Sequence, residues 1–407
     1  MIEAAHAVWL NGRRIGTILQ RGDVARFLFV EYYWDDPTRE VLGLWFEDDP
    51  RRSPQAALRL PAWFSNLLPE GALRQWIARD QGVSADRELQ LLLRIGRDLP
   101  GAVQVIPADE GDPVQPELLG EVIPDTSTTS PKAGQLKFSL AGVGLKFSLL
   151  KKGERLTIPA GDAVGDWIVK FPDPHYRDVP ANEFATMSLA GRVGITIPEV
   201  NLVHRDELPP LDRIVWPGSE TQAYAVARFD RGPGGQRIHI EDFAQVRGFY
   251  ADDKYSGSFE TVAALVYRNR DRTALQEFVR RLTFNLLVGN GDAHLKNWSL
   301  IYADGRVPTL SPAYDLVSTG PYFPENTPDD FGLKFGGTKV AERIGRGAFQ
   351  KLQQRLGVTS ADVLDIVDQT IERFTTAWDS GSRATFPQFV ADWIDTRCVH
   401  ARKQLGA

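Results

Sequence analysis

Three oxygen-bearing side chains, Asp292, Asn297 and Asp315, follow one another in the second half of the chain at spacings that suit phosphoryl transfer. Asp292 and Asn297 lie five positions apart, and Asp315 follows 18 residues after Asn297. In protein kinases a catalytic-loop Asp accepts the proton of the substrate hydroxyl, an Asn five residues later binds magnesium, and another Asp binds magnesium after a short hairpin. Taken alone, either Asp292 or Asn297 is better explained as a turn residue. The order of all three favours catalysis.

The chain around Asp292 indicates how these side chains are displayed. A long apolar helix pattern covers residues 278–288, and a strand pattern covers residues 299–302. Gly289 and Gly291 lie between these patterns, and glycine both ends a helix and permits a sharp turn. We therefore expect Asp292 to lie on a loop between a buried helix and a strand.

A glycine-rich hairpin is expected upstream. Two near-identical strand patterns, at residues 136–140 and 145–149, flank a turn that contains Gly142, Val143 and Gly144. Backbone amides at such a turn can approach phosphate oxygens closely, because glycine has no Cβ. A lone Gly-x-Gly hairpin is usually just a turn, but this one precedes a strand that carries a lysine, which favours nucleotide binding.

That lysine is Lys170, in an apolar strand pattern at residues 166–172. A charged group in such a strand needs a partner. Kinases pair this lysine with a glutamate on the next helix, and Glu183 is placed to be that glutamate. The alternative is a lysine on an edge strand with its ammonium in water.

The patterns along the chain predict an α+β protein with a bilobal protein-kinase-like fold and an extra N-terminal α+β subdomain. The subdomain covers residues 1–107, and a polar linker rich in proline and threonine covers residues 108–135. Residues 136–231 form the β-rich N-lobe with the glycine-rich loop, and residues 232–407 form the helical C-lobe with the catalytic and metal-binding loops.

Shorter patterns give expectations that a structure can test. Strands are expected at residues 26–33 and 41–46, and a helix is expected at residues 241–246. We interpret Arg97 and Asp98 as a structural pair and expect no chemistry elsewhere in the first hundred residues.

Composition limits the classes of function. A net charge of −6 argues against broad nonspecific binding to nucleic acid. Cys398 is the single cysteine, so neither an internal disulfide nor a cysteine-based zinc site is expected, and the six scattered histidines show no ligand spacing. The sequence shows no leader pattern and no apolar run of membrane-spanning length, so we expect a soluble cytoplasmic protein that does not bind membranes.

These motifs together resemble the HipA family, the serine/threonine-protein kinase toxins of bacterial type II toxin–antitoxin pairs. The resemblance extends over nearly the whole chain, and the motif around Asp292 is fairly specific. Gly144 departs from the family pattern, in which a glutamine is common. The matching segments are residues 64–71, 96–102, 138–143, 168–170, 228–231, 241–243, 290–297 and 314–315.

The resemblance implies roles for individual residues. It implies that Asp292 is the catalytic base, that Asn297 and Asp315 hold Mg²⁺, and that Ser139 is an autophosphorylated serine. It also implies that the loop at residues 140–146 covers the ATP phosphates and that residues 227–229 form the adenine hinge. The residues implied in ATP binding are Gly142, Val143, Gly144, Lys146, Lys170, Glu183, Ala227, Arg228, Phe229, His294 and Asn297.

The resemblance further implies partners and a cellular role. The family partner is a small helix-turn-helix antitoxin, HipB-like, which binds operator DNA and the toxin together. The family substrates are aminoacyl-tRNA synthetases, whose phosphorylation stalls translation and arrests growth, as in persistence. Both ATP and Mg²⁺ are implied as cofactors.

Two other functions are compatible with the sequence. One is a weakly active kinase fold that acts mainly as a co-repressor with its antitoxin, which the change at Gly144 slightly favours. The intact set of proposed site residues disfavours it: Asp292, Asn297, Asp315 and Lys170. The other is a small-molecule phosphotransferase, which shares the Asp–Asn–Asp order. The N-terminal subdomain and Ser139 disfavour this second alternative.

Overall fold

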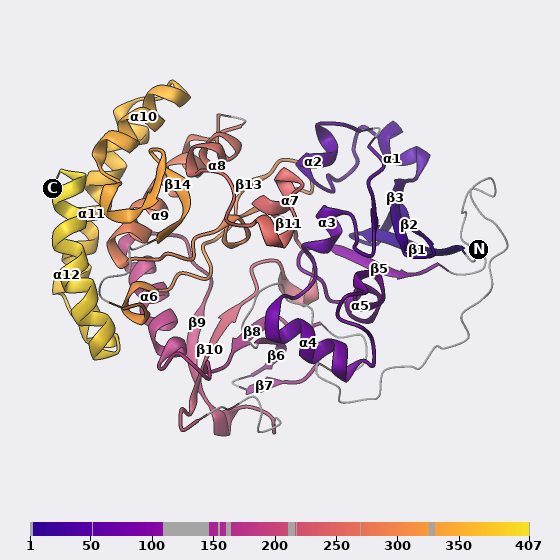
Figure 1. The fold of residues 1–407 in the computed structure, drawn as a ribbon, viewed down its shortest axis with the longest axis horizontal. Helices are drawn as coiled ribbons and strands as arrows, with labels where there is room; N and C mark the ends of the chain where they lie inside the picture. The colour runs from indigo at the N-terminus through magenta and orange to yellow at the C-terminus, as the bar shows by residue number, and fades with distance from the viewer. Residues whose placement is uncertain are drawn as a thin grey trace.

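The computed structural model of the chain describes residues 3–50, 52–108, 146–153, 155–159, 164–210, 216, 218–268, 270–324 and 330–406 (Figure 1). Ser139, Gly142, Val143 and Gly144, together with nearly all of the expected linker, lie outside the described residues. None of the helices in the described part is long and apolar enough to cross a lipid bilayer.

The N-terminal subdomain contains a five-stranded antiparallel sheet with the strand order β4-β3-β2-β1-β5. A turn at Asn11 and Gly12 joins the first two strands, and both residues have the positive φ angles of a tight hairpin (47° and 78°). The strands are β1 (Glu3–Leu10), β2 (Arg13–Arg21), β3 (Val24–Phe29), β4 (Gln55–Ala57) and β5 (Val103–Pro107). The helices are α1 (Glu31–Asp35), α2 (Leu44–Glu47), α3 (Ala62–Ser65), α4 (Gly71–Asp80) and α5 (Glu88–Ile95).

Two strand predictions in this subdomain need correction. The strand expected at residues 41–46 is wrong, because Leu44–Glu47 is the short helix α2. The strand expected at residues 26–33 ends at Phe29, and α1 follows it. Short apolar runs fit a buried strand and a buried helical turn equally well, so periodicity alone does not separate them.

The β-rich lobe is a second five-stranded sheet with the order β7-β6-β8-β10-β9, crossed by one long helix, α6. Lys146, Lys170 and Tyr224 are direct cross-strand neighbours on β6, β8 and β10. Because side chains alternate along a strand, all three project from the same face of the sheet. The elements are β6 (Lys146–Lys152), β7 (Arg155–Thr157), β8 (Trp167–Lys170), α6 (Val179–Val193), β9 (Val200–His204) and β10 (Gln222–Ala227).

The N-terminal subdomain and the β-rich lobe share one hydrophobic core. Phe147 and Val169, on the other face of the lobe sheet, belong to the same buried cluster as Trp63 and Phe64 of the subdomain. The ring of Phe147 lies 5.5 Å from that of Trp76 on α4. The N-terminal subdomain and the β-rich lobe are therefore separate segments of the chain that share a single hydrophobic core.

The helical lobe forms the other end of the molecule, where α10, α11 and α12 lie opposite the N-terminal subdomain (Figure 1). Its long helix α9 is buried along much of its length and contacts α11 and α12. The helices are α7 (Phe243–Arg247), α8 (Phe259–Val266), α9 (Arg272–Val288), α10 (Arg346–Leu356), α11 (Leu364–Asp379) and α12 (Gln388–Leu405). The strands are β11 (His239–Asp242), β12 (Ser299–Tyr302), β13 (Thr309–Leu310), β14 (Asp330–Phe335) and β15 (Thr338–Val340).

The helix expected at residues 241–246 begins later than the sequence suggested. Residues His239–Asp242 form strand β11, which pairs with β12. Asp242 is the N-cap of α7, and its carboxylate and the Gln245 side chain form a reciprocal capping box. A capping residue has extended backbone angles, so the helix starts after Asp242.

Candidate active site

A cleft of about 340 Å³ opens between the β-rich lobe, the helical lobe and the N-terminal subdomain. Side chains from all three parts line it, including Asn66 and Glu70 of the subdomain. Every described residue that the sequence assigned to catalysis, ATP or metal lies along this cleft. These residues are Lys146, Lys170, Glu183, Ala227, Arg228, Phe229, Asp292, His294, Asn297 and Asp315.

Lys170 joins the β-rich lobe to the loop that carries Asp315. Its ammonium donates to Glu183 of α6 at 2.5 Å and also contacts the carboxylate of Asp315. Burial disfavours the charged ammonium, but the two carboxylates outweigh burial and hold the pKa of Lys170 above its ordinary value. The alternative of a solvated edge-strand lysine is therefore wrong.

The charged groups around Lys170 shift the pKa values of one another. Burial raises the pKa of Glu183 to about 7, although Lys170 lies beside it. Burial also acts on Asp315, but Lys170 and Lys146 outweigh it and lower the pKa of that carboxyl below its ordinary range. Burial lowers the pKa of Lys146, the cross-strand neighbour of Lys170. The cleft therefore holds two lysines and two acids within one buried group of interacting charges.

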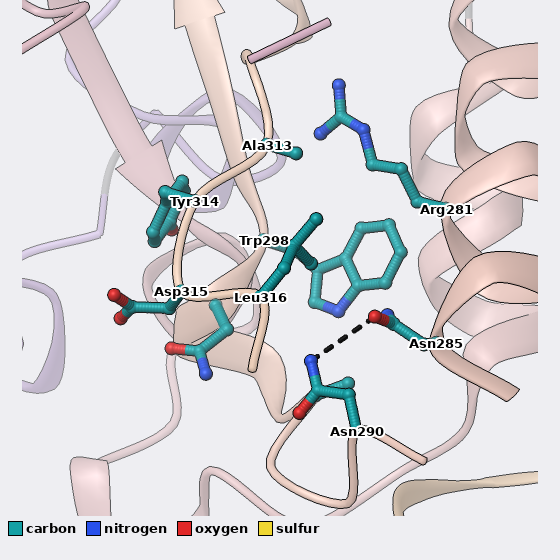
Figure 2. A pocket seen from close by; sticks show the side chains of 10 residues that line it. Arg281, Asn285, Asn290, Trp298, Ala313, Tyr314, Asp315 and Leu316 are labelled. Atoms are coloured by element: carbon teal, nitrogen blue, oxygen red, sulfur yellow. Dashed lines mark hydrogen bonds between the residues drawn. The ribbon is translucent and has the colours of Figure 1, made fainter. Parts of the chain in front are cut away.

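The backbone at Asp315 is unusual. Its φ angle is +55°, in the left-handed region that non-glycine residues seldom adopt. Tyr314 anchors the segment, since its phenol donates to the carbonyl of Lys296 at 2.9 Å. Figure 2 shows the Asp315 carboxylate directed away from the side chains of Asn285 and Asn290. The loop thus presents Asp315 to the cleft.

The loop that carries Asp292 is fixed by its neighbours in the sequence. Gly289 ends α9 with φ +63°. Gly291 has no room for a side chain, since a Cβ there would lie 2.5 Å from the carbonyl oxygen of Asp330. The buried Asn290 amide donates to Asn285 at 3.2 Å (Figure 2) and accepts the Asp292 N–H at 3.1 Å. Asn290 and both glycines therefore shape the loop.

Asp292 itself makes contacts on several sides. Its side chain is 46% exposed, and its Oδ1 accepts a hydrogen bond from the Tyr255 phenol at 2.5 Å. Its backbone carbonyl accepts from Nδ2 of Asn297 at 2.7 Å, so Asp292 and Asn297 lie side by side. The Nε2 of His294 lies 3.8 Å from Oδ1, and burial lowers the pKa of His294 to about 3, which keeps this imidazole neutral.

The N-terminal subdomain contributes directly to the cleft, where the sequence gave no expectation of chemistry. Glu70 accepts from Lys254 at 2.8 Å. Asn66 accepts from the Lys296 ammonium through its backbone carbonyl at 2.9 Å and its side chain at 3.0 Å, and Asp242 accepts from the same ammonium at 2.9 Å. The signal available in the sequence was the motif at residues 64–71, which contains both Asn66 and Glu70.

The expected hinge residues Ala227, Arg228 and Phe229 all line the cleft. The Arg228 guanidinium turns away into a buried network, where it donates to Asp98 at 2.9 Å and to Asp230 at 2.8 Å. The Arg228 N–H is also engaged, because it donates to the Asp166 carbonyl at 2.8 Å. The side chain and the backbone N–H of Arg228 are therefore both engaged in contacts within the protein.

Asp98 is structural, as the sequence suggested, but its predicted pairing with Arg97 needs correction, because its ion-pair partners come from a distant part of the chain. Its carboxylate accepts from Arg228 and, at 3.0 Å, from Arg231. Burial alone would raise the pKa of Asp98, but the two guanidinium groups outweigh it and hold that pKa below its ordinary value. This network ties the segment before β5 to the segment after β10.

Comparison with known proteins identifies the family. Residues 6–106 match the HipA N-terminal domain, and residues 138–378 match the HipA-like C-terminal domain. The chain belongs to the HipA family. Y4dM of Sinorhizobium fredii, whose name proposes that it is a kinase, is 42% identical across 96% of this chain and 95% of its own length.

HipA of Shewanella oneidensis extends the comparison in both sequence and structure. The serine/threonine-protein kinase toxin HipA is 31% identical over 63% of this chain and 62% of its own length. The solved complex of HipA with HipB and operator DNA contains a chain with the same fold, with a TM-score of 0.73, 23% identity and coverage of 98% of this chain and 97% of that chain. The bilobal kinase-like fold with an N-terminal subdomain is therefore that of HipA.

Proposed function

We propose that this HipA-family chain is an ATP- and Mg²⁺-dependent serine/threonine-protein kinase. The observation that carries the proposal is the gathering of Asp292, Asn297, Asp315 and the Lys170–Glu183 pair around one cleft. These are the positions that phosphoryl transfer requires for a base, a metal and a phosphate-binding lysine. The intact set disfavours a function as a binding module alone.

The residues present fit magnesium bound together with ATP. Within the described residues, no group of three or more His, Cys, Asp or Glu side chains could hold a metal ion by itself. Magnesium usually takes one or two protein ligands and completes its shell with phosphate oxygens and water. Asn297 and Asp315 would hold the ion, and Lys170 and Lys146 would offset the phosphate charge. When bound, magnesium-ATP supplies the phosphoryl group and neutralises charge at its oxygens.

In this proposal Asp292 acts on the acceptor. Its half-exposed carboxylate would accept the proton of a serine or threonine hydroxyl as that oxygen bonds to the γ-phosphorus of ATP, the bond from this phosphorus to the bridging oxygen breaks, and ADP leaves. Its backbone bond to Asn297 keeps the base next to the proposed metal ligand. Lys296 lies in the loop between Asp292 and Asn297. Its hydrogen bonds to Asn66 and Asp242 hold this loop in place.

The test is phosphate transfer from labelled ATP by the purified chain and by Asp292→Ala. We expect the variant to lose roughly 10²–10⁴-fold in rate. Its urea unfolding midpoint should change little, because the Asp292 side chain is 46% exposed. A variant that turns over like the wild type would exclude Asp292 as the base.

The relatives suggest the biological setting of this activity. By analogy with the Shewanella HipA–HipB–DNA complex, the partner is a small helix-turn-helix antitoxin that binds operator DNA. The substrate is a translation component such as an aminoacyl-tRNA synthetase, and its phosphorylation arrests growth. Expression of the chain alone should stop growth of its host, and co-expression of the antitoxin encoded beside it should restore growth. Unaffected growth with active protein would contradict the toxin role.

Self-modification at Ser139 is a further part of the proposal. The support for this part is the family motif at residues 138–143. Ser139 itself lies outside the described residues. Ser148, in the second copy of the same five-residue pattern, is the matched control because its side chain is fully buried and accepts from Arg228 at 3.2 Å. After incubation with magnesium-ATP, mass spectrometry should find phosphate on Ser139 in the wild type only, and on Ser148 in neither wild type nor Asp292→Ala. An active enzyme without phosphate on Ser139 would contradict this.

A further inference from the structure

The Tyr255 phenol occupies a position at Asp292 where the proposed kinase needs another hydroxyl. Its O–H donates to Oδ1 of Asp292 at 2.5 Å. A serine or threonine acceptor would approach the same carboxylate with the same kind of donor, an O–H group. A hydroxyl from the chain itself therefore holds the acceptor position in this structure.

The backbone around Tyr255 is anchored to the helical lobe and to the N-terminal subdomain. The carbonyl of Lys254 accepts the N–H of Leu295, and the Lys254 ammonium donates to Glu70 at 2.8 Å. The Tyr255 ring meets His294 edge-on, with centroids 5.0 Å apart and planes at 85°. These contacts fix the base of the side chain and leave its hydroxyl end over Asp292.

The Tyr255 side chain nevertheless has room to leave. The residue is 40% exposed, whereas its neighbour His294 is buried. Gly257, two residues later, has φ +106°, which permits a sharp turn after the segment. A hydrogen bond to a half-exposed carboxylate contributes only modestly in net terms, because water competes for both partners. An arriving acceptor can therefore replace the phenol at small cost.

We propose that Tyr255 is a positioning residue that holds the acceptor site at Asp292 in the resting protein and gives it up to the substrate hydroxyl. The inference rests on the proposed kinase function. While the phenol is in place, water does not occupy this position, so transfer of phosphate to water is suppressed. A protein acceptor that binds the cleft displaces the phenol and gains the carboxylate as its base.

Tyr255→Phe tests this, because phenylalanine keeps the ring against His294 and removes the donor. We expect ATP hydrolysis without a protein acceptor to rise about fivefold, which is the population effect of losing one modest hydrogen bond. With myelin basic protein as a generic acceptor, KM should fall by a similar factor and kcat should change less than twofold. Tyr250→Phe is the matched control, since the Tyr250 phenol donates to the Leu60 carbonyl at 3.2 Å and not to Asp292. It should leave both activities unchanged.

Two kinetic outcomes would overturn the inference. The first is that Tyr255→Phe lowers turnover with both water and myelin basic protein as acceptors and leaves KM unchanged. This result would mean that the phenol acts in the transition state. The other is no change in either activity.

A measurement that needs no activity separates this inference from the proposed function. Urea unfolding of Tyr255→Phe, Asp292→Ala and the double variant forms a cycle, and a direct bond predicts non-additivity of about fivefold in the unfolding equilibrium constant. Additive effects contradict the inference whatever the activity is. If the two substitutions are coupled but the wild-type chain transfers no phosphate, the contact between Tyr255 and Asp292 is established. That result contradicts the proposed kinase function, and the proposed role of Tyr255 fails with it.

Discussion

Glu70 of the N-terminal subdomain and Lys254 of the helical lobe form a 2.8 Å ion pair at the edge of the candidate active site. Both side chains are largely buried, at 16% and 12% exposure. Lys254 precedes Tyr255, which contacts Asp292. The subdomain is thus joined to the loop that carries Asp292 through a short series of contacts, and it forms a structural part of the candidate active site.

Glu70→Gln should loosen this connection. Removing one charge leaves Lys254 partly desolvated without its partner, so we expect the free energy of unfolding to fall by about 1–3 kcal/mol. ATP hydrolysis without a protein acceptor should rise, as in Tyr255→Phe, because the segment that holds the phenol at Asp292 loses an anchor. Asp23→Asn is the control, since its pair with Arg87 is about half exposed on both sides (52% and 53%). The control should change the free energy of unfolding by about 0–1 kcal/mol. Equal losses of this free energy in the two variants would contradict the proposed connection.

Asp315→Ala should impair binding of magnesium-ATP. The variant removes a proposed metal ligand and also frees Lys170 from one of its two carboxylates. Titration calorimetry of ATP with and without magnesium measures this, and we expect the gain in affinity from magnesium to be lost. Asp304→Ala, in the exposed turn after β12, should retain that gain. A variant of Asp315 that binds magnesium-ATP like the wild type would show that the ligand assignment is wrong.

Asp98→Ala should destabilise the folded chain strongly. Asp98 and Arg228 have side-chain exposures of 4% and 1%, and Arg231 shares the same carboxylate. Breaking a buried ion pair from one side leaves uncompensated charge, which typically costs about 3–5 kcal/mol. Urea unfolding measures the loss. A change below about 1 kcal/mol, as for a surface pair, would mean that the network contributes little to holding the N-terminal subdomain in place.

Stability should fall in mild acid because of His239. This residue lies fully buried on β11, and its Nε2–H donates to the Leu42 carbonyl at 2.7 Å. Burial lowers the pKa of His239 from 6.5 to about 4. The unfolded chain therefore binds the proton first as the pH falls. The contribution of His239 to stability is complete above the unfolded pKa and is lost as the pH falls through the folded one.

Urea unfolding at neutral pH and near pH 5 measures this effect. We expect His239 to account for about 2 kcal/mol of the loss between these conditions. His239→Gln keeps a donor for the Leu42 carbonyl and does not titrate, so its stability should depend less steeply on pH. An unchanged slope in the variant would contradict the assignment.

The sequence alone determined the features that depend on neighbours along the chain. The spacing of Asp292, Asn297 and Asp315, the strand that carries Lys170 and the helix that carries Glu183 were all visible as local patterns. Their order reflects a loop between a helix and a strand, followed by the β12–β13 hairpin, and the structure has these elements. Local patterns misplaced α2 and the start of α7, because short apolar runs fit more than one element.

The tertiary structure decided which distant residues complete the site. Glu70 and Lys254 are 184 positions apart, and Asp98 lies 130 positions from Arg228. No periodicity links residues at such separations, and each of these side chains would be an ordinary solvated charge in an extended chain. Asp98 meets Arg228 because the N-terminal subdomain and the β-rich lobe bury their apolar faces in one core. Glu70 meets Lys254 because α2 and α3 of the subdomain pack against α7 of the helical lobe, and both residues then line the cleft with Asp292. Burial then makes their pairing necessary, since an unpaired charge away from water is costly.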